Sequence, residues 1–399
     1  MIKSLKMKRV VVGMSGGVDS SVAAYLLKKQ GYDVVGLFMI NWHDTTGTLE
    51  GDCPWDDDLL FARLVARKLG IEIHTVDLSN PYRKRVVDYM FEEYKQGRTP
   101  NPDVLCNREI KFDLFIAEAL KLGADYIATG HYCRKETIKV QRKTIHRLLS
   151  GRDPNKDQSY FLCQVNQNQL SNVIFPIGAM HKYEVRKIAV EQGLATAEKK
   201  DSQGICFVGK VDLPTFLQQK LKPKKGRIIE VPDGFFKVNG VEFKELSGPE
   251  DLCKPHSLNP SIGKQVGTHN GAHFFTIGQN KGLNIGGRPK PSFVIGMDVD
   301  KNLLYTGLGK EHPGLYRKGL TINAQEEHWI REDFKLNPGE RAEYLVRIRY
   351  RQPLQKAILI REKDKLYIVF NKKQRGIAPG QFAAWYRDDE LVGSAPILF

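Results

Sequence analysis

The feature that most constrains this chain is a glycine- and serine-rich turn between a short apolar run and a helix-like stretch. Arg9–Met14 is rich in β-branched residues, Asp19–Gln30 has helical spacing, and the joining string is Gly13-Met14-Ser15-Gly16-Gly17-Val18-Asp19-Ser20-Ser21. Adjacent glycines let backbone N–H groups turn toward an anion, and the helix N-terminus adds its dipole. The string predicts a phosphate cradle; the alternative is a plain glycine turn with Asp19 or Ser20 as the helix cap.

Strand and helix patterns alternate as far as residue 212. The strand-like runs are Arg9–Met14, Asp33–Ile40, Ile71–Val76 and Asp125–Thr129. The later helix-like stretches are Trp55–Leu69, Asn80–Tyr94 and Glu109–Leu122. Such alternation is typical of βαβ units in an open, doubly wound parallel sheet, whose sites lie at the carboxyl ends of the strands.

The pattern changes after a helix expected over Asp212–Leu221. Short strand-like runs follow, and the regularly alternating ones are Glu343–Tyr350, Lys356–Arg361, Leu366–Phe370 and Gln381–Tyr386. Closely spaced strands of this kind are typical of a small antiparallel barrel. We therefore predict an α/β chain with a doubly wound parallel-sheet domain over 1–212, a small mixed central domain over 213–312 and a C-terminal antiparallel β-barrel over 313–399.

The chain is strongly basic. Its 399 residues include 61 Lys and Arg against 46 Asp and Glu, a formal net charge of +15. This excess favours a polyanionic partner, either a nucleic acid or an anionic membrane face, although a generally basic proteome would also produce it. The sequence has no apolar run of about 18 residues, the length of a membrane span, and no apolar signal-peptide core near its start. We expect a cytoplasmic protein without a membrane partner.

The cysteines are spread along the chain without a Cys-x-x-Cys pair. They are Cys53, Cys106, Cys133, Cys163, Cys206 and Cys253. This spacing predicts free thiols rather than a disulfide framework, and His and Cys show no metal-ligand spacing.

Two of these cysteines have surroundings that favour reactivity. Cys106 precedes a helix expected to begin between Asn107 and Glu109, with Arg108 and Lys111 nearby, so the helix dipole and the cations would favour its thiolate. Cys206 lies in a polar, glycine-containing run that is typical of a loop. The other four fit inert core residues.

The glycine string resembles a known nucleotide-binding loop. It lacks the Gly-Lys-Ser/Thr of a Walker A loop, which disfavours an NTPase that cleaves the γ-phosphate. Ser15 to Ser21, SGGVDSS, is instead similar to the PP-loop of the ATP pyrophosphatase superfamily, the adenine nucleotide alpha hydrolase-like enzymes that cleave ATP between the α- and β-phosphates.

Further motifs, spanning nearly the whole chain, resemble in their order those of the tRNA-specific 2-thiouridylases. They are Gly36–Met39, Asn101–Asn107, Thr129–Tyr132, Lys156–Leu162, Asp201–Phe207, Thr276–Gln279, Arg349–Gln352 and Pro379–Gln381.

This resemblance implies an enzyme that replaces the C2 oxygen of the wobble uridine in tRNA with sulfur. ATP would adenylate that oxygen, with Mg²⁺ expected beside it, so that AMP leaves in place of oxide. A cysteine desulfurase or a relay protein would supply a persulfide, and the tRNAs for Lys, Glu and Gln would be the substrates. Cys206 would carry the persulfide, and Cys106 would resolve it to a disulfide that needs reduction. Asp103 would donate a proton or position the base, unless it is only a helix cap.

The resemblance also assigns binding residues. For ATP they are Gly13, Met14, Ser15, Gly16, Gly17, Val18, Asp19, Ser20, Ser21, Met39 and Gly130. For tRNA they are Asn101, Pro102, Asp103, His131, Lys156, Asp157, Gln158, Arg349, Tyr350 and Gln381. The first three of these would hold the flipped uridine, because its reacting atom lies within the stack of the anticodon loop.

Basic residues are expected to add a wider tRNA footprint. One group is Arg134, Lys135, Lys139, Arg142, Lys143 and Arg147; a second is Lys220, Lys222, Lys224, Lys225 and Arg227. Arg347, Arg349 and Arg351 alternate, which predicts one shared strand face, with Tyr344 and Tyr350 on the other.

The chain departs from the family pattern between Glu230 and Gly267, where a longer run predicts inserted loops over 230–266. Three alternatives stay open. One is a small-molecule PP-loop ligase of the argininosuccinate or nucleotide amidating type, and another is a non-catalytic tRNA-binding protein. The third keeps the thiolation but replaces the persulfide with an iron–sulfur cluster held by Cys106, Cys206 and a third ligand such as Asp103.

Overall fold

The computed structural model describes residues 7–43, 55–201, 212–238 and 248–399. Its N-terminal part contains a five-stranded sheet in the order β3-β2-β1-β4-β7, with every pair parallel. The strands are β1 (Arg9–Met14), β2 (Asp33–Ile40), β3 (Glu72–Asp77), β4 (Tyr126–Ala128) and β7 (Val173–Ile174). Because β2 and β3 lie on one side of β1 and the later strands on the other, the edge between β1 and β4 is the topological switch point.

Helices cover both faces of this sheet, because alternate residues of a strand point to opposite sides. Val10 and Val12 of β1 share a core with one set of helices, α1 (Val18–Lys29), α2 (Asp56–Leu69) and α8 (Lys182–Glu191). Val11 faces the other way and shares a core with residues of the helical stretch 79–121. The predicted doubly wound parallel sheet is confirmed.

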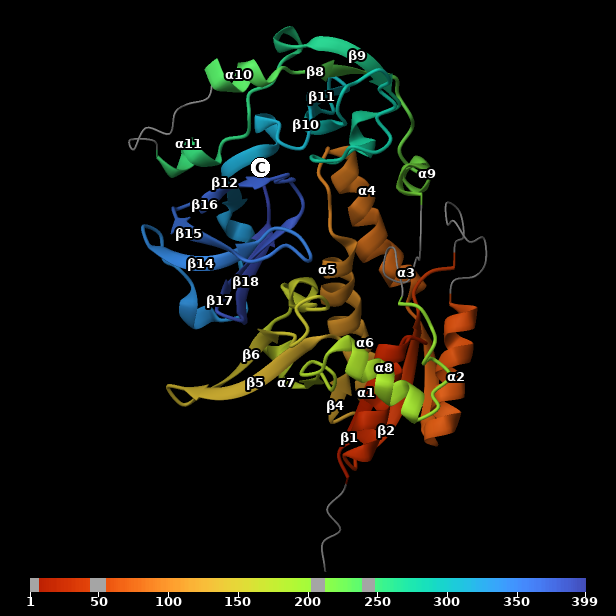
Figure 1. The fold of residues 1–399 in the computed structure, drawn as a ribbon. Coiled ribbons are helices and arrows are strands. Elements are labelled where there is room, and N and C mark those ends of the chain that lie inside the picture. Colours follow the sequence, from red (N-terminus) through yellow and green to blue (C-terminus); the bar gives the residue numbers. More distant parts are fainter. Residues whose placement is uncertain (1–6, 44–54, 202–211, 239–247) are drawn as a thin grey trace, which may run out of the picture.

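The helical stretch 79–121 consists of short α- and π-helical segments rather than of two regular helices. Its segments are α3 (Ser79–Tyr82), the π-helical η1 (Arg83–Val87), α4 (Asp88–Lys95), α5 (Pro102–Cys106), the π-helical η2 (Asn107–Leu114) and α6 (Phe115–Lys121). In Figure 1, α4 and α5 run between the parallel sheet at the bottom and the central domain at the top, with the C-terminal barrel beside them. Single π-helical turns inside helices are frequent at functional sites.

The central part is a four-stranded sheet with short helices around it. Its order is β10-β11-β8-β9. The elements are α9 (Leu213–Gln218), β8 (Gly226–Glu230), α10 (Asp233–Val238), α11 (Pro249–Cys253), β9 (Lys264–His269), β10 (Ser292–Asp298) and β11 (Leu303–Leu308). The inserted loops predicted over 230–266 fall on α10, α11 and the start of β9, and residues 239–247 lie outside the described ranges.

The C-terminal part is an antiparallel barrel, as predicted. Its strands are β12 (Tyr316–Asn323), β13 (His328–Trp329), β14 (Arg341–Arg347), β15 (Gln355–Arg361), β16 (Lys365–Arg375), β17 (Phe382–Arg387) and β18 (Glu390–Pro396). Hydrogen bonds from Thr321 N–H to the carbonyl of Phe399 (3.0 Å) and from Leu398 N–H to the carbonyl of Thr321 (2.9 Å) join β12 to the end of the chain.

A hairpin from the first domain extends the barrel sheet. It consists of β5 (Cys133–Val140) and β6 (Lys143–Ser150), and β6 pairs with β18 through Leu148 and Leu149. The short helix α7 (Gln167–Ser171) follows it along the chain. Among all the helices in the described ranges, none is both long and apolar enough to cross a membrane.

Candidate active site

The turn between β1 and α1 is held by its own serines. The Ser20 hydroxyl accepts a hydrogen bond from the backbone N–H of Ser15 (3.1 Å) and donates to the carbonyl of Gly17 (3.1 Å). The Ser21 hydroxyl donates to the same carbonyl (2.8 Å). Gly17 is the N-cap of α1 and no side chain caps the helix, so the alternative of a turn capped by Asp19 or Ser20 is wrong. The first N–H groups of α1 are left without a side-chain cap, as anion binding requires.

Met39 and Gly130 lie at the edge of the sheet where the turn lies. Met39 is the penultimate residue of β2, and Gly130 follows the end of β4 by two residues. A Cβ atom on Gly130 would lie 2.7 Å from the backbone nitrogen of Ser20, so this close approach to α1 requires glycine. The switch-point edge is therefore built from the turn and the end of β4, where open α/β sheets bind nucleotides.

A lysine that the sequence patterns did not single out links this turn to a distant segment. The Lys182 ammonium lies 2.8 Å from both carboxylate oxygens of Asp19 and 2.8 Å from the Asp201 carboxylate. The Tyr132 hydroxyl also donates to Asp19 (2.7 Å). Lys182 is 163 positions from Asp19, and no local pattern connects residues so far apart.

Asp201 is the centre of a cluster of cations. Besides Lys182, it pairs with Lys156 (2.7 Å) and Arg186 (3.0 Å). Burial would raise its pKa, but hydrogen bonds from Lys156 and Lys182 outweigh that effect and hold the pKa of Asp201 at about 2. The residue is therefore a fixed anion at neutral pH. It is also the last described residue before 202–211, which include Cys206.

Cys106 is the last residue of α5 and is fully buried. This helix begins at Pro102, and its N-cap is Asn101, whose side-chain oxygen accepts a hydrogen bond from the N–H of Val104 (3.2 Å). A helical segment, η2, does begin at Asn107 as expected, but α5 runs into it without a break, so Cys106 lies within a continuous helix and not at a free N-terminus. The alternative reading of Asp103 as the cap is wrong. The N-terminal dipole acts on Asp103, in the first turn, more than on Cys106. The pair Asn101-Pro102, a cap followed by proline, was the sequence signal for this start.

Three of the cysteines predicted to be inert are buried core residues. Burial raises the pKa of the Cys163 and Cys253 thiols to about 12 and that of Cys133 well above its usual value. These thiols stay protonated at neutral pH and are poor nucleophiles. Cys53 and Cys206 lie outside the described residues.

Comparisons with known proteins identify the family. Residues 8–210 match the tRNA methyl transferase HUP domain, 256–308 the tRNA methyl transferase PRC-barrel domain, and 320–397 the aminomethyltransferase beta-barrel domain. The tRNA-specific 2-thiouridylase MnmA of Flavobacterium johnsoniae is 59% identical over 394 residues, which cover 98% of this chain and 100% of the relative. Its namesakes in Christiangramia forsetii and Halalkalibacterium halodurans are 58% and 45% identical, over 98% of this chain and 100% and 94% of the relatives.

The chain belongs to the tRNA-specific 2-thiouridylase family. The resemblance drawn from the motifs is confirmed, and the first domain is that of a PP-loop nucleotide-binding enzyme.

In this 2-thiouridylase, His131 is buried rather than exposed. Its Nδ1 lies 2.7 Å from the Thr129 hydroxyl, and its ring packs against Phe112 and Phe175. Burial, with a smaller effect of Lys111, lowers the pKa of His131 well below its usual value. The imidazole is therefore neutral at physiological pH.

The segment Lys156–Gln158, assigned to tRNA by the motifs, is bonded within this 2-thiouridylase. Asp157 forms a buried ion pair with Arg347 of the barrel (2.9 Å), and the side-chain oxygen of Gln158 accepts the N–H of Tyr132 (2.9 Å). Lys156 pairs with Asp201. The segment thus connects the barrel, the end of β4 and the Asp201 cluster.

The prediction that Arg347, Arg349 and Arg351 share one strand face is wrong. Strand β14 ends at Arg347, and the chain then turns, with the Gln352 side-chain oxygen accepting the N–H of Ile348 (2.8 Å). Arg351 has a φ of 61°, which strands do not adopt. Tyr350, in the same turn, packs on Phe161 of the first domain, with ring centroids 4.3 Å apart.

The basic hairpin β5–β6 divides into a paired base and an exposed tip. At the base, Arg134 pairs with Asp389, Arg147 pairs with Glu136 and Glu390, and Lys135 donates to the carbonyls of Leu170 and Ser171. At the tip, Lys139, Arg142 and Lys143 are exposed. Only part of the predicted positive cluster is therefore available to an anionic partner.

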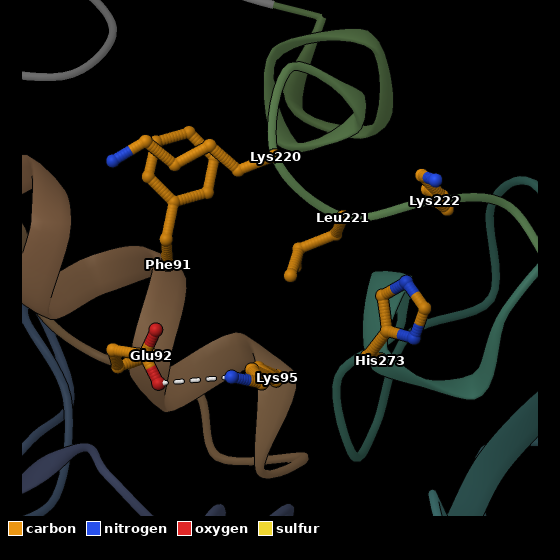
Figure 2. Close-up of a pocket in the computed structure, with 7 residues that line it drawn as sticks. All are labelled: Phe91, Glu92, Lys95, Lys220, Leu221, Lys222 and His273. Atoms are coloured by element: carbon orange, nitrogen blue, oxygen red, sulfur yellow. Dashed lines mark hydrogen bonds and ion pairs between the residues drawn. The ribbon is translucent and has the colours of Figure 1, made fainter.

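Two members of the second basic group, Lys220 and Lys222, line a pocket of about 520 Å³ between the first and central domains. Figure 2 shows Lys220, Leu221 and Lys222 facing α4 on one side and His273 of the central domain on the other. Lys220 pairs with Asp88, and Lys95 on the α4 side lies 3.5 Å from Glu92. Lys95, Lys220 and Lys222 line this pocket together with apolar side chains that include Phe91.

Proposed function

We propose that this 2-thiouridylase adenylates the C2 oxygen of the wobble uridine in tRNA and then replaces that oxygen with persulfide sulfur. The observation that carries the proposal is the anion-binding turn at the sheet's switch point, in a chain whose relatives are tRNA-specific 2-thiouridylases over their whole length. Residues 13–21 would bind the phosphates of ATP, with Met39 and Gly130 beside the adenosine.

At C2 of the uridine, the bond to oxygen is broken and a bond to sulfur is formed. The uridine oxygen attacks the α-phosphorus of ATP and releases pyrophosphate, which leaves an O-adenylated C2. The terminal sulfur of a Cys206 persulfide attacks C2, and AMP departs with the original oxygen. The Cys106 thiolate then attacks the Cys206 sulfur, so that the terminal sulfur stays on C2 and a Cys106–Cys206 disulfide forms. A thiol reductant supplies two electrons to restore the enzyme.

The buried position of Cys106 supports a protected thiol that meets the base within the protein. Asp103, in the first turn of the same helix, would position the flipped uridine or give it a proton, together with Asn101 and Pro102. The sulfur donor would be a cysteine desulfurase or a relay protein, and the tRNAs for Lys, Glu and Gln would be the substrates.

Mg²⁺ would accompany ATP rather than bind the protein alone. Within 7–43, 55–201, 212–238 and 248–399, no three His, Cys, Asp or Glu side chains gather as a metal site. Mg²⁺ binds readily through one or two carboxylates plus substrate phosphates, and Asp19 at the turn would serve as such a carboxylate by giving up bonds that Lys182 makes to both of its oxygens. When bound, the ion would neutralise charge on the departing pyrophosphate.

The exposed cations would bind the tRNA backbone. The exposed members of the two basic groups are the tip of the β5–β6 hairpin and the whole second group, Lys220, Lys222, Lys224, Lys225 and Arg227. Phosphate contacts of this kind supply salt-dependent affinity. Arg349 and Tyr350 would contact the tRNA from the barrel side, whereas the side chain of Gln381, also assigned to tRNA by the motifs, is bonded to Thr99 and Pro100.

The test is nucleoside mass spectrometry of unmodified tRNA after incubation with the protein, ATP and a persulfide source. We expect 2-thiouridine at the wobble position, with one AMP formed for each sulfur transferred. AMP formation that does not depend on tRNA would instead indicate a small-molecule ligase, and tRNA binding without AMP formation would indicate a non-catalytic binder. Stoichiometric iron in anaerobically purified protein would replace the persulfide route with a cluster.

A further inference from the structure

The segment that leads into α5 lies where the three parts of the chain meet. Thr99 donates its N–H to the carbonyl of Pro379 in the barrel (2.7 Å). The side-chain amide of Gln381 donates to the carbonyls of both Thr99 and Pro100 (3.1 Å each), and its oxygen lies 3.5 Å from the Asn101 amide nitrogen. The barrel therefore holds three consecutive residues immediately before Pro102.

The central domain holds the same segment from another side. The hydroxyls of Thr99 and Thr276 lie 3.1 Å apart and form a hydrogen bond. The backbone of Thr276 is itself fixed, because its N–H donates to the Gln279 side chain (3.1 Å). Two residues upstream of Thr99, a Cβ on Gly97 would lie 2.8 Å from Val299, so the two domains pack backbone against side chain there.

The helix at the end of this segment begins at the residues that the other domains hold. Helix α5 runs directly into η2, because Cys106 and Asn107 both have helical backbone angles, so the entry to its first turn is fixed from the N-terminal side by its cap. Its N-cap, Asn101, is within the segment that the other two domains hold. The position of Asp103 and Cys106 therefore depends on contacts made with Thr276 and Gln381, 177 and 282 positions away from Thr99.

We infer that Thr276 and Gln381 are positioning residues, which act on sulfur transfer by holding Thr99–Asn101 and with it the helix of Asp103 and Cys106. This inference rests on the function proposed above. It gives the central and C-terminal domains a part in the chemistry, besides any contact with tRNA. Hydrogen bonds within the protein would then account for the motifs Thr276–Gln279 and Pro379–Gln381, because each motif supplies a bond to Thr99–Asn101.

The experiment uses Thr276→Val and Gln381→Met in the full chain, with Thr306→Val as the matched control. Thr306 is a buried central-domain threonine whose hydroxyl has no hydrogen-bond partner among the described residues, so its loss changes packing without removing a bond seen there. Single-turnover 2-thiouridine formation should fall roughly 10- to 100-fold in the two test variants, because small misplacements of reacting groups have effects of that size. tRNA dissociation constants should stay within about twofold.

A second measurement is independent of the reaction. Amide hydrogen exchange of the peptide 99–106, in the protein without tRNA or ATP, should be faster in both test variants and unchanged in Thr306→Val. Weaker tRNA binding with an unchanged transfer rate and unchanged exchange would overturn the inference and leave Gln381 a tRNA contact. If the wild-type protein made no 2-thiouridine, the proposed function would fail, while the exchange result would still decide whether the two residues hold the helix.

Discussion

The nucleotide-binding turn and the helix of Cys106 belong to the same domain, yet contacts of different range fix them. Ser15, Gly17 and Ser20 bond to one another within five positions of the chain. The entry to α5 is held by Thr276 and Gln381, from two other parts of the molecule. The serine and glycine contacts of the turn, the ATP half of the site, are therefore local, although Lys182 and Tyr132 add distant bonds to Asp19, whereas the entry to the Cys106 helix, the thiol half, depends on two other parts of the chain. The two halves should fail separately when residues are changed.

The largest expected effect separates the halves completely. Cys106→Ser and Cys206→Ser should each reduce 2-thiouridine to the detection limit, because each removes one sulfur of the proposed disulfide. Pyrophosphate release with ATP and tRNA should survive, because adenylation precedes the sulfur step and neither residue belongs to the turn. Cys253→Ala, at a buried cysteine of the central part, is the control and should keep both activities. Unchanged thiolation in either serine variant would refute the two-thiol assignment.

The next effect is aimed at the nucleotide half. Lys182→Met leaves the carboxylates of Asp19 and Asp201 without their shared cation, so AMP formation should fall roughly 10- to 100-fold. Lys187→Met, on the same helix, is the control, because Lys187 is 73% exposed and forms a surface pair with Glu191 at 3.8 Å. Equal AMP formation by the two variants, measured per folded molecule, would limit Lys182 to a structural role.

The same difference in range explains which features could be predicted from the sequence. The span Asp33–Ile40 agrees with β2 residue for residue, and the turn after β1 was recognised, because a strand pattern and a glycine string are local signals. Lys182 was missed because its partners come from distant positions. The three arginines after Glu343 were misplaced because a turn begins after Arg347, although Ile348 and Tyr350 continue the alternating pattern. For Cys106 the local signal existed, in Asn101-Pro102, but the helix was expected to start later.

A smaller effect tests the remote support of the thiol half. Gly380 has a φ of 87°, and a Cβ there would lie 3.0 Å from backbone atoms of Thr99. Gly380→Ala should lower the free energy of unfolding by about 2–4 kcal/mol, from backbone strain plus the clash, and should slow sulfur transfer several-fold without changing pyrophosphate release.

The matched control for this change is Gly339→Ala. Gly339 has a φ of 92°, but no atom of the described part of the chain lies within 4 Å of the added Cβ, so its variant carries the strain alone, about 1–2 kcal/mol. Urea unfolding and single-turnover assays of both variants separate the effect of backbone strain from the effect of the clash with Thr99. The same loss of transfer in Gly339→Ala would mean that general destabilisation, rather than the contact with Thr99, slows the reaction.

The smallest expected effect is on the pH dependence of folding stability. It concerns Asp201, which pairs with Lys182 beside the turn and directly precedes residues 202–211, which include Cys206. Cations from Lys156 and Lys182 hold the pKa of Asp201 at about 2, below its ordinary value of 3.8, so the folded state favours the carboxylate. Its stabilising contribution is complete above about pH 4 and is lost as the pH falls toward 2, because the unfolded chain takes up the proton first. Asp201→Asn should therefore flatten the acid side of the stability profile between these values, measured by urea unfolding at each pH.

Asp88→Asn is the comparison, since Asp88 pairs with Lys220 at a surface site and shows no such network. An acid limb unchanged by Asp201→Asn would mean that the cation cluster contributes nothing to folding and serves only to place Lys182 beside the nucleotide-binding turn.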